Sequence, residues 1–326
     1  MFLKEANFSI WCDFIERDFL NKGFKDLIKR GIINGATSNP AIFKSAFLNS
    51  LAYKEQKEKL KGSGKKEIYE ELAIKDIRDA ADILMPLYEK EDDGFVSIEV
   101  DPFLCDDTKA TIDEGRRLFK KIDRANVMIK IPATKAGYEA MRELTGEGIN
   151  VNATLVFSKE QGEKSLKALK EGIQKSNTLT KGVISIFVSR FDRATDAILQ
   201  KKGLNGGLFG IMNAADIYND IEEESFPHIK ALFASTGVKG DDYEGDYYMK
   251  ELLYKNSINT APLNTIETFV KNSSFEIKNP PSKEETESFF QKLKREQIDR
   301  ENISAKLMNE GILAFKEAFG DILDNL

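Results

Sequence analysis

Short apolar segments alternate with amphipathic segments along most of the chain. The short segments are rich in β-branched and aromatic residues, which is typical of buried strands, whereas the others repeat apolar residues at helical spacing. We expect strands at residues 8–13, 32–38, 95–101, 126–132, 149–157, 182–188, 229–235 and 258–261. We expect helices at residues 19–28, 41–60, 67–91, 108–122, 134–144, from 158, 190–201, 211–224, 247–254 and from 282 to 326.

Strands that alternate with helices predict an α/β chain, and this number of strands favours a (β/α)8 TIM-type barrel. We expect a single barrel domain over residues 1–326, with a C-terminal helical extension from about residue 282. The extension is interpreted as a solvated charged face over an apolar core stripe, and secondarily as an oligomer contact. A doubly wound open sheet is the alternative fold. No Gly-x-Gly-x-x-Gly follows the first predicted strand, so dinucleotide binding has no support.

The fourth predicted strand contains a lysine, Lys130, which shares one strand face with Met128 and Pro132. If both faces of this strand are covered, the lysine is buried, and burial favours its neutral amine. A neutral amine is a far better nucleophile toward a carbonyl carbon than an ammonium group. The alternative is a lysine whose stem packs at the strand end while its ammonium reaches solvent.

Other predicted strands also contain or end in polar residues where an apolar residue would pack better. They are Asp13, Glu99, Asn152, Thr154 and Ser185. A buried carboxylate is costly unless it is neutralised or paired. In a (β/α)8 barrel the strands converge on the C-terminal mouth, where the active sites of this fold lie. Each residue alone could be satisfied locally, but together they predict a catalytic site with Lys130.

The composition argues against nucleic-acid binding, membrane association and a multi-histidine metal site. The chain has 326 residues, 48 Lys and Arg against 54 Asp and Glu, and a net charge of -6, which argues against a general nucleic-acid or anionic-membrane surface. The single histidine, His228, excludes a multi-histidine metal site. Cys12 and Cys105 lack metal-site spacing and are typical of cytosolic thiols. Residues 1–9 lack a secretory apolar core and no apolar run could span a bilayer, so we expect a cytoplasmic protein without a metal.

Two segments together resemble the signatures of the transaldolase family. They are residues 37–43, Thr-Ser-Asn-Pro-Ala-Ile-Phe, and residues 127–134, Val-Met-Ile-Lys-Ile-Pro-Ala-Thr. The similarity extends to residues 97–101, 149–158, 185–190, 234–239 and 259–262. The resemblance therefore spans the chain from about Trp11 to the final helices, and it implies the same barrel fold.

The resemblance implies catalytic roles for four residues. Lys130 forms a Schiff base with a ketose donor, and the protonated imine serves as an electron sink. Asp13 takes the proton from the C4 hydroxyl of the donor during cleavage and returns it to the acceptor aldehyde. Glu99 works through a water, helped by Thr154, to move protons while the imine forms.

The resemblance also implies residues that bind the substrate. Asn39 and Asn152 hold the hydroxyls of the dihydroxyacetone unit, Ser185 contacts the same fragment, and Phe187 lines the pocket and limits water. The phosphate is assigned to Arg190, Ser235 and Lys239. Some members of the family have an arginine two positions after the serine, where this chain has Gly237, so Lys239 is assigned by similarity to another branch of the family.

The expected activity is transfer of a dihydroxyacetone unit in the pentose phosphate pathway. The donor is sedoheptulose 7-phosphate or fructose 6-phosphate, and the acceptor is glyceraldehyde 3-phosphate or erythrose 4-phosphate. The resemblance implies no cofactor, sugar phosphates as the only ligands, and a homodimer, although members of the family differ in oligomeric state.

Two alternatives stay open. One is a lysine-dependent aldolase that releases free dihydroxyacetone, although related aldolases tend to carry Gln in place of Glu99 and Tyr in place of Phe187. The other is a catalytically silent sugar-phosphate-binding barrel, which would be expected to have lost Lys130, Asp13 or Glu99.

Overall fold

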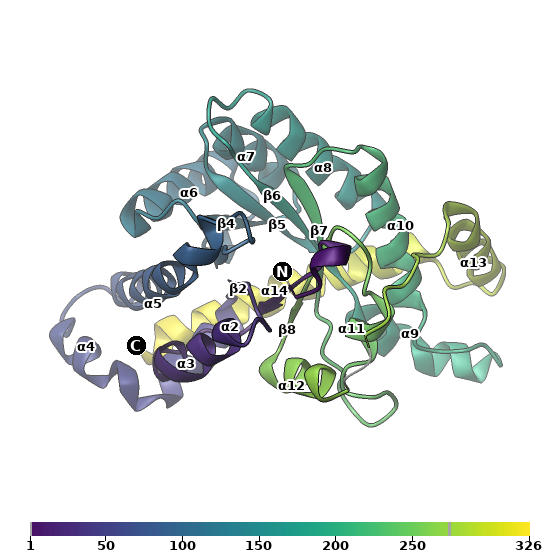
Figure 1. Ribbon diagram of the computed structural model, residues 1–326, viewed down its shortest axis with the longest axis horizontal. Coiled ribbons are helices and arrows are strands. Elements are labelled where there is room, and N and C mark those ends of the chain that lie inside the picture. Colours follow the sequence, from purple (N-terminus) through teal and green to yellow (C-terminus); the bar gives the residue numbers. More distant parts are fainter. Residues whose placement is uncertain (1, 273–274) are drawn as a thin grey trace.

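A computed structural model, which describes residues 2–272 and 275–326, confirms the predicted barrel. Eight parallel strands form a closed sheet in the order β1-β2-β3-β4-β5-β6-β7-β8, which excludes the doubly wound alternative (Figure 1). The strands are β1 (Ser9–Cys12), β2 (Gly35–Thr37), β3 (Val96–Glu99), β4 (Val127–Pro132), β5 (Asn150–Val156), β6 (Gly182–Phe187), β7 (Ile229–Ala234) and β8 (Ser257–Ala261).

Helices surround the sheet and connect its strands (Figure 1). The α-helices are α1 (Arg17–Phe19), α2 (Lys25–Lys29), α3 (Pro40–Asn49), α4 (Lys54–Lys59), α5 (Lys65–Tyr88), α6 (Thr108–Ile122), α7 (Lys135–Gly146), α8 (Lys159–Ile173), α9 (Ser189–Lys201), α10 (Phe209–Glu223), α11 (Tyr247–Glu251), α12 (Leu263–Lys271), α13 (Lys283–Arg295) and α14 (Arg300–Asn325). Shorter turns are η1 (Lys4–Ala6), the π-helical η2 (Leu20–Phe24), η3 (Leu51–Tyr53) and η4 (Pro102–Leu104). In the described part of the chain, no helix combines the length and apolar character needed to cross a membrane.

The main differences from the predicted elements are one interrupted helix, one shorter strand and one additional helix. The helix predicted at residues 41–60 is interrupted because Ser50 has extended backbone angles (φ -90°, ψ 133°) and its side chain accepts a hydrogen bond from the amide of Ala52. The second strand begins only at Gly35, three residues later than predicted, and a helix that was not predicted, α12, follows Pro262.

Side chains of β4 alternate between the two faces of the sheet, as predicted from the strand period. Ile129 points outward to α6, where a β-carbon on Gly115 would lie 3.4 Å from its Cγ2 atom. Met128, 1% exposed, and Lys130, 5% exposed, point into the barrel. Both faces of the strand are therefore covered, and the alternative of a solvated Lys130 is wrong.

The long C-terminal helix α14 crosses the C-terminal end of the barrel, and it lies behind the strands in Figure 1. The helix packs closely against the barrel because position 311 is glycine. A β-carbon there would lie 3.0 Å from Leu155 Cδ2 and 3.3 Å from Arg190 Nη1. The apolar stripe predicted for this helix is a core stripe. Its members Leu307 and Phe315 are buried among apolar side chains.

Candidate active site

A cavity of about 480 Å³ opens at the C-terminal ends of the strands. Side chains at or just after the ends of parallel strands converge at this face of a closed barrel. Eight of the eleven predicted site residues line this cavity: Asp13, Asn39, Lys130, Ser185, Phe187, Arg190, Ser235 and Lys239. The remaining three, Glu99, Asn152 and Thr154, are not among the cavity-lining residues and are buried inside the barrel.

Lys130 lies between two other predicted site residues because of the strand register. Glu99 on β3 and Asn152 on β5 are its direct partners across the sheet. The Lys130 ammonium donates a hydrogen bond to the carbonyl oxygen of Ser38 at 3.1 Å, and its Nζ lies 3.9 Å from Glu99 Oε2. The two side chains are only 6% and 3% exposed, so this pair is almost removed from water.

Glu99 is a strongly perturbed carboxyl group of the site. Burial raises its pKa to about 8, with Asp13 adding to the rise and the positive charge of Lys130 opposing it. Neither carboxyl oxygen has a hydrogen-bond partner among the described residues, and the same holds for the Thr154 hydroxyl. A carboxyl group with this pKa carries a proton through most of the neutral range and can either give or take one.

Asp13 follows β1 and lies at the edge of the cavity. Its Oδ1 atom accepts a hydrogen bond from the Thr37 hydroxyl at 2.7 Å. Burial raises the pKa of Asp13, while Lys130 and the hydrogen bonds from Thr37 and Asn39 oppose the rise. Thr37 in turn lies 2.6 Å from the hydroxyl of Thr260, so the carboxylate is held by a chain of polar side chains on neighbouring strands.

A second polar chain fixes the amide of Asn152. The amide donates a hydrogen bond to the Ser97 hydroxyl at 3.0 Å, and its oxygen accepts one from the Ser185 hydroxyl at 2.7 Å. These bonds connect β3, β5 and β6 across the barrel interior. Because both ends of the amide are engaged, Asn152 has one defined orientation, with one N–H left to donate.

Basic side chains gather at one side of the cavity. The Arg190 guanidinium lies 5.1 Å from the centre of the Phe187 ring, and burial lowers the pKa of Arg190. Ser235 follows β7 in a left-handed backbone conformation (φ 55°), and its hydroxyl lies 3.1 Å from that of Ser189. The exposed Lys239 also lines this side.

Among the cavity-lining residues that sequence reasoning missed, two stand near the predicted ones. Arg193 lies three residues after Arg190 on α9, and that helical spacing was the signal that could have identified it. Phe315 on α14 lines the cavity with its ring centre 6.0 Å from Lys130 Nζ. No sequence signal distinguished Phe315 from the other members of the apolar stripe.

The described residues include no group of three or more His, Cys, Asp or Glu side chains arranged to hold a metal ion. The chemistry that the cavity offers is that of a buried amine with carboxyl groups on two sides and cations at one end. Such a set suits covalent attack on a carbonyl carbon with proton transfer nearby.

Comparison with known proteins matches the whole barrel. The family model described as Transaldolase/Fructose-6-phosphate aldolase matches residues 10–326. A Campylobacter jejuni subsp. jejuni serotype O:6 protein named transaldolase is 51% identical, over 98% of this chain and 99% of its own. A Helicobacter pylori (strain Shi470) protein, also named transaldolase, is 47% identical over 98% of this chain and 99% of its own length.

Replacing Glu99 with Gln tests whether burial keeps this carboxyl group protonated. Its pKa is about 8 in the folded protein against an ordinary 4.5, so folding stability is lost as pH rises from 4.5 through 8. Gln does not titrate. The free energy of unfolding of Glu99→Gln relative to wild type should therefore rise by about 2–4 kcal/mol between pH 5 and pH 8, measured with urea.

The exposed Glu287→Gln serves as the control, and its stability relative to wild type should change little over this range. A Glu99→Gln difference that is independent of pH contradicts the raised pKa.

Proposed function

The chain belongs to the transaldolase/fructose-6-phosphate aldolase family and is a transaldolase, and from that membership we propose that Lys130 forms a Schiff base with a ketose phosphate. The donor is sedoheptulose 7-phosphate or fructose 6-phosphate, and the acceptor is glyceraldehyde 3-phosphate or erythrose 4-phosphate. The observation that carries the proposal is the placement of a buried lysine amine at the floor of a cavity, 3.9 Å from the carboxyl group of Glu99.

Imine formation requires two proton transfers. The neutral Lys130 amine attacks the C2 carbonyl of the donor and one of its protons moves to the carbonyl oxygen, and the hydroxyl of the resulting carbinolamine must then gain a second proton to leave as water. Glu99 is placed to supply this proton, through a water, because burial raises its pKa to about 8. Thr154, whose hydroxyl is buried on β5, assists in this transfer.

Carbon–carbon cleavage requires a base on the far side of the imine. Asp13 removes the proton of the C4 hydroxyl, the bond between C3 and C4 breaks, and its electrons move to the protonated imine of Lys130 to give an enamine. The aldose phosphate leaves as the aldehyde. Transfer is the reverse sequence with the acceptor aldehyde, in which Asp13 returns the proton to the new hydroxyl.

Polar side chains around the imine hold the three-carbon unit during the exchange of aldehydes. Asn39 and Ser185 line the cavity beside Lys130, and Asn152 contributes its remaining N–H from below. Keeping the unit in one orientation matters because the enamine must survive until the acceptor binds.

The phosphate of donor and acceptor binds at the basic end of the cavity. Arg190 offers a planar pair of N–H donors from a partly desolvated position, which suits a phosphate group. Ser235, Lys239 and Arg193 line the same end and complete the clamp.

Chemical trapping tests the covalent role of Lys130. Borohydride added during reaction with fructose 6-phosphate should reduce the imine and leave a three-carbon adduct on Lys130, identified by peptide mass spectrometry. Lys130→Ala should form no adduct and show no turnover, whereas Lys135→Ala, which removes an exposed lysine outside the cavity, should retain both. Folded protein that forms no adduct on Lys130 at saturating donor would refute the Schiff base.

Removing the Arg190 side chain should separate phosphorylated from unphosphorylated donors. A charge-assisted hydrogen bond contributes about 1.5–3 kcal/mol, so kcat/KM of Arg190→Ala for fructose 6-phosphate should fall about 10- to 100-fold. Turnover of fructose, which has no phosphate, should change far less. An equal loss for both donors would place Arg190 outside the phosphate site.

The ring of Phe315 tests the alternative of an aldolase that releases free dihydroxyacetone. Because it lies 6.0 Å from Lys130 Nζ in a buried position, it shields the reaction intermediate from water. Phe315→Ala should raise the rate of dihydroxyacetone release without acceptor, relative to transfer, by about tenfold. Leu313→Ala, two residues away and 56% exposed, is the control. Fast release by wild type without acceptor would favour the aldolase.

A further inference from the structure

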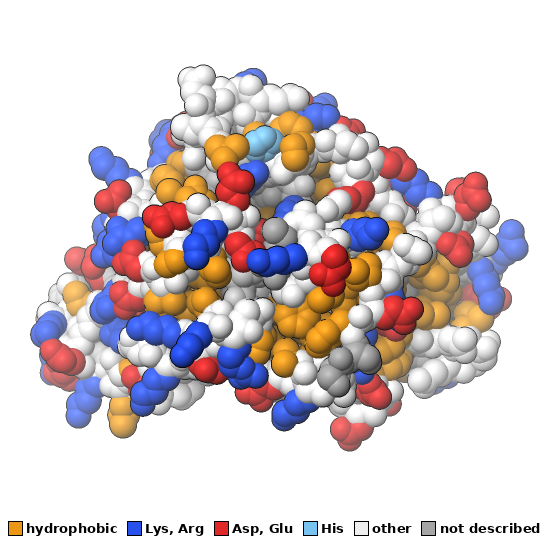
Figure 2. All heavy atoms as spheres, in the orientation of Figure 1, with side chains coloured by type: hydrophobic (Ala, Val, Ile, Leu, Met, Phe, Trp, Pro, Cys, Tyr) orange, Lys and Arg blue, Asp and Glu red, His pale blue; other side chains and the backbone are white. Residues whose placement is uncertain are grey.

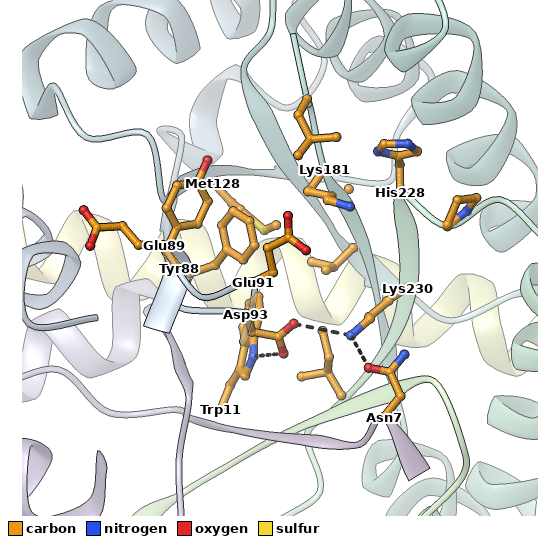
Figure 3. A pocket seen from close by; sticks show the side chains of 16 residues that line it. Asn7, Trp11, Tyr88, Glu89, Glu91, Asp93, Met128, Lys181, His228 and Lys230 are labelled. Atoms are coloured by element: carbon orange, nitrogen blue, oxygen red, sulfur yellow. Dashed lines mark hydrogen bonds and ion pairs between the residues drawn. The ribbon is translucent and has the colours of Figure 1, made fainter. Parts of the chain in front are cut away.

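A second cavity, of about 610 Å³, lies at the opposite, N-terminal end of the barrel (Figure 3). Its volume falls within the range of about 300–1,000 Å³ that is usual for small-molecule sites. The walls come from the first residues of the strands and from the loops that precede them. None of the catalytic residues proposed above lines it.

The inner wall of this cavity is aromatic and apolar. Trp11 and Phe95 lie with ring centres 6.4 Å apart at 32°, and Tyr88 packs edge-on against Phe95 at 5.2 Å. The position of Trp11 is fixed from two sides. Its Nε1 donates a hydrogen bond to Asp93 at 3.2 Å, and its ring packs so closely on Gly35 that a β-carbon there would lie 2.5 Å from Cδ1. Trp11 is fully buried and supports this wall, so a planar apolar group meets the partly exposed ring of Tyr88 and the edge of Phe95, which is 7% exposed.

Two lysines line the cavity, and their ammonium groups differ in the contacts that they make. Lys230 donates hydrogen bonds to Asp93 at 3.3 Å and to Asn7 at 3.2 Å. Lys181 has no hydrogen-bond or ion-pair partner for its ammonium among residues 2–272 and 275–326, although its side chain is half-buried. Burial and the nearby charge of Lys230 lower the pKa of Lys181, while the charges of Glu91 and Asp93 oppose the fall. No carboxylate of the described chain lies within ion-pair distance of this ammonium, which leaves it open to an anion in the cavity.

A histidine lies beside Lys181 at the rim, whereas two carboxylates lie at the mouth of the cavity. His228 lies on the same side in Figure 3, and its Nδ1 atom is buried without a partner in the described chain. In Figure 2 the histidine lies among hydrophobic side chains. Glu89 and Glu91 also line the cavity, but both are exposed at its mouth, where water screens their charges. Leu179, 63% exposed, adds an apolar side chain at the mouth.

We propose that this cavity binds a small carboxylate with a planar apolar ring. The carboxylate pairs with Lys181 and lies near His228, and the ring packs on Tyr88 and Phe95, next to the buried Trp11. The site is separate from the catalytic cavity, and its occupancy does not depend on the reaction proposed above.

The chain contains a single tryptophan, Trp11, so its fluorescence and its indole N–H resonance report on this cavity without mutation. Benzoate should change both signals saturably, and it should bind about tenfold more tightly than its neutral analogue benzamide, because one ion pair distinguishes the two. Benzylamine, which carries the opposite charge, should bind more weakly than either. No saturable response to benzoate, or tighter binding of benzylamine, would overturn the proposal.

Matched variants locate the binding. Lys181→Met should lower the affinity for benzoate about tenfold and leave that for benzamide unchanged, and Lys181→Gln provides a second neutral variant. Lys175→Met removes an exposed lysine that does not line the cavity and should have no effect. Unchanged benzoate affinity in both Lys181 variants overturns the proposal. Displacement of benzoate by fructose 6-phosphate or inorganic phosphate would instead assign it to the catalytic cavity.

Discussion

Lys130 and Glu99 occupy paired positions on neighbouring parallel strands, and both side chains are almost fully removed from water. Taking charged groups out of water is costly, and the mutual attraction of a pair at 3.9 Å recovers only part of that cost. The conflict is reduced when the carboxyl group holds a proton, which agrees with its pKa of about 8. In an open sheet, water would reach this pair from one face. The closed barrel is therefore what keeps a proton beside the amine that is proposed to react.

The C-terminal helix connects the two ends of the catalytic cavity. Gly311 allows α14 to lie against Arg190, and one helical turn later Phe315 covers Lys130. The same helix thus contacts the side chain proposed to bind phosphate and the lysine proposed to bind the sugar carbon. Because both contacts depend on how closely α14 approaches the barrel, displacement of this helix would affect substrate binding and solvent access together.

The sequence was sufficient to predict the barrel and the direction of the side chains on β4, since both follow from the period of apolar residues. It also identified Lys130, Asp13 and Glu99, because polar residues in apolar strands are unusual. It did not predict the contacts made by residues distant in sequence. Phe315 is one apolar residue among several in a helical stripe, and only the crossing of α14 over the barrel brings it to Lys130.

The two cavities of the barrel share the strands β1 and β4. Trp11 on β1 lines the N-terminal cavity and Asp13, directly after β1, lines the catalytic one, and on β4 the same holds for Met128 and Lys130. Residues two apart on a strand face the same way and lie about 7 Å apart, so a single layer of side chains separates the cavities. Met128 and Trp11 are both buried in that layer. Because a packed interior deforms little, a ligand in the N-terminal cavity would influence Lys130 by moving side chains of this layer such as Met128 and Trp11, and a ligand that fits the preformed wall would move neither.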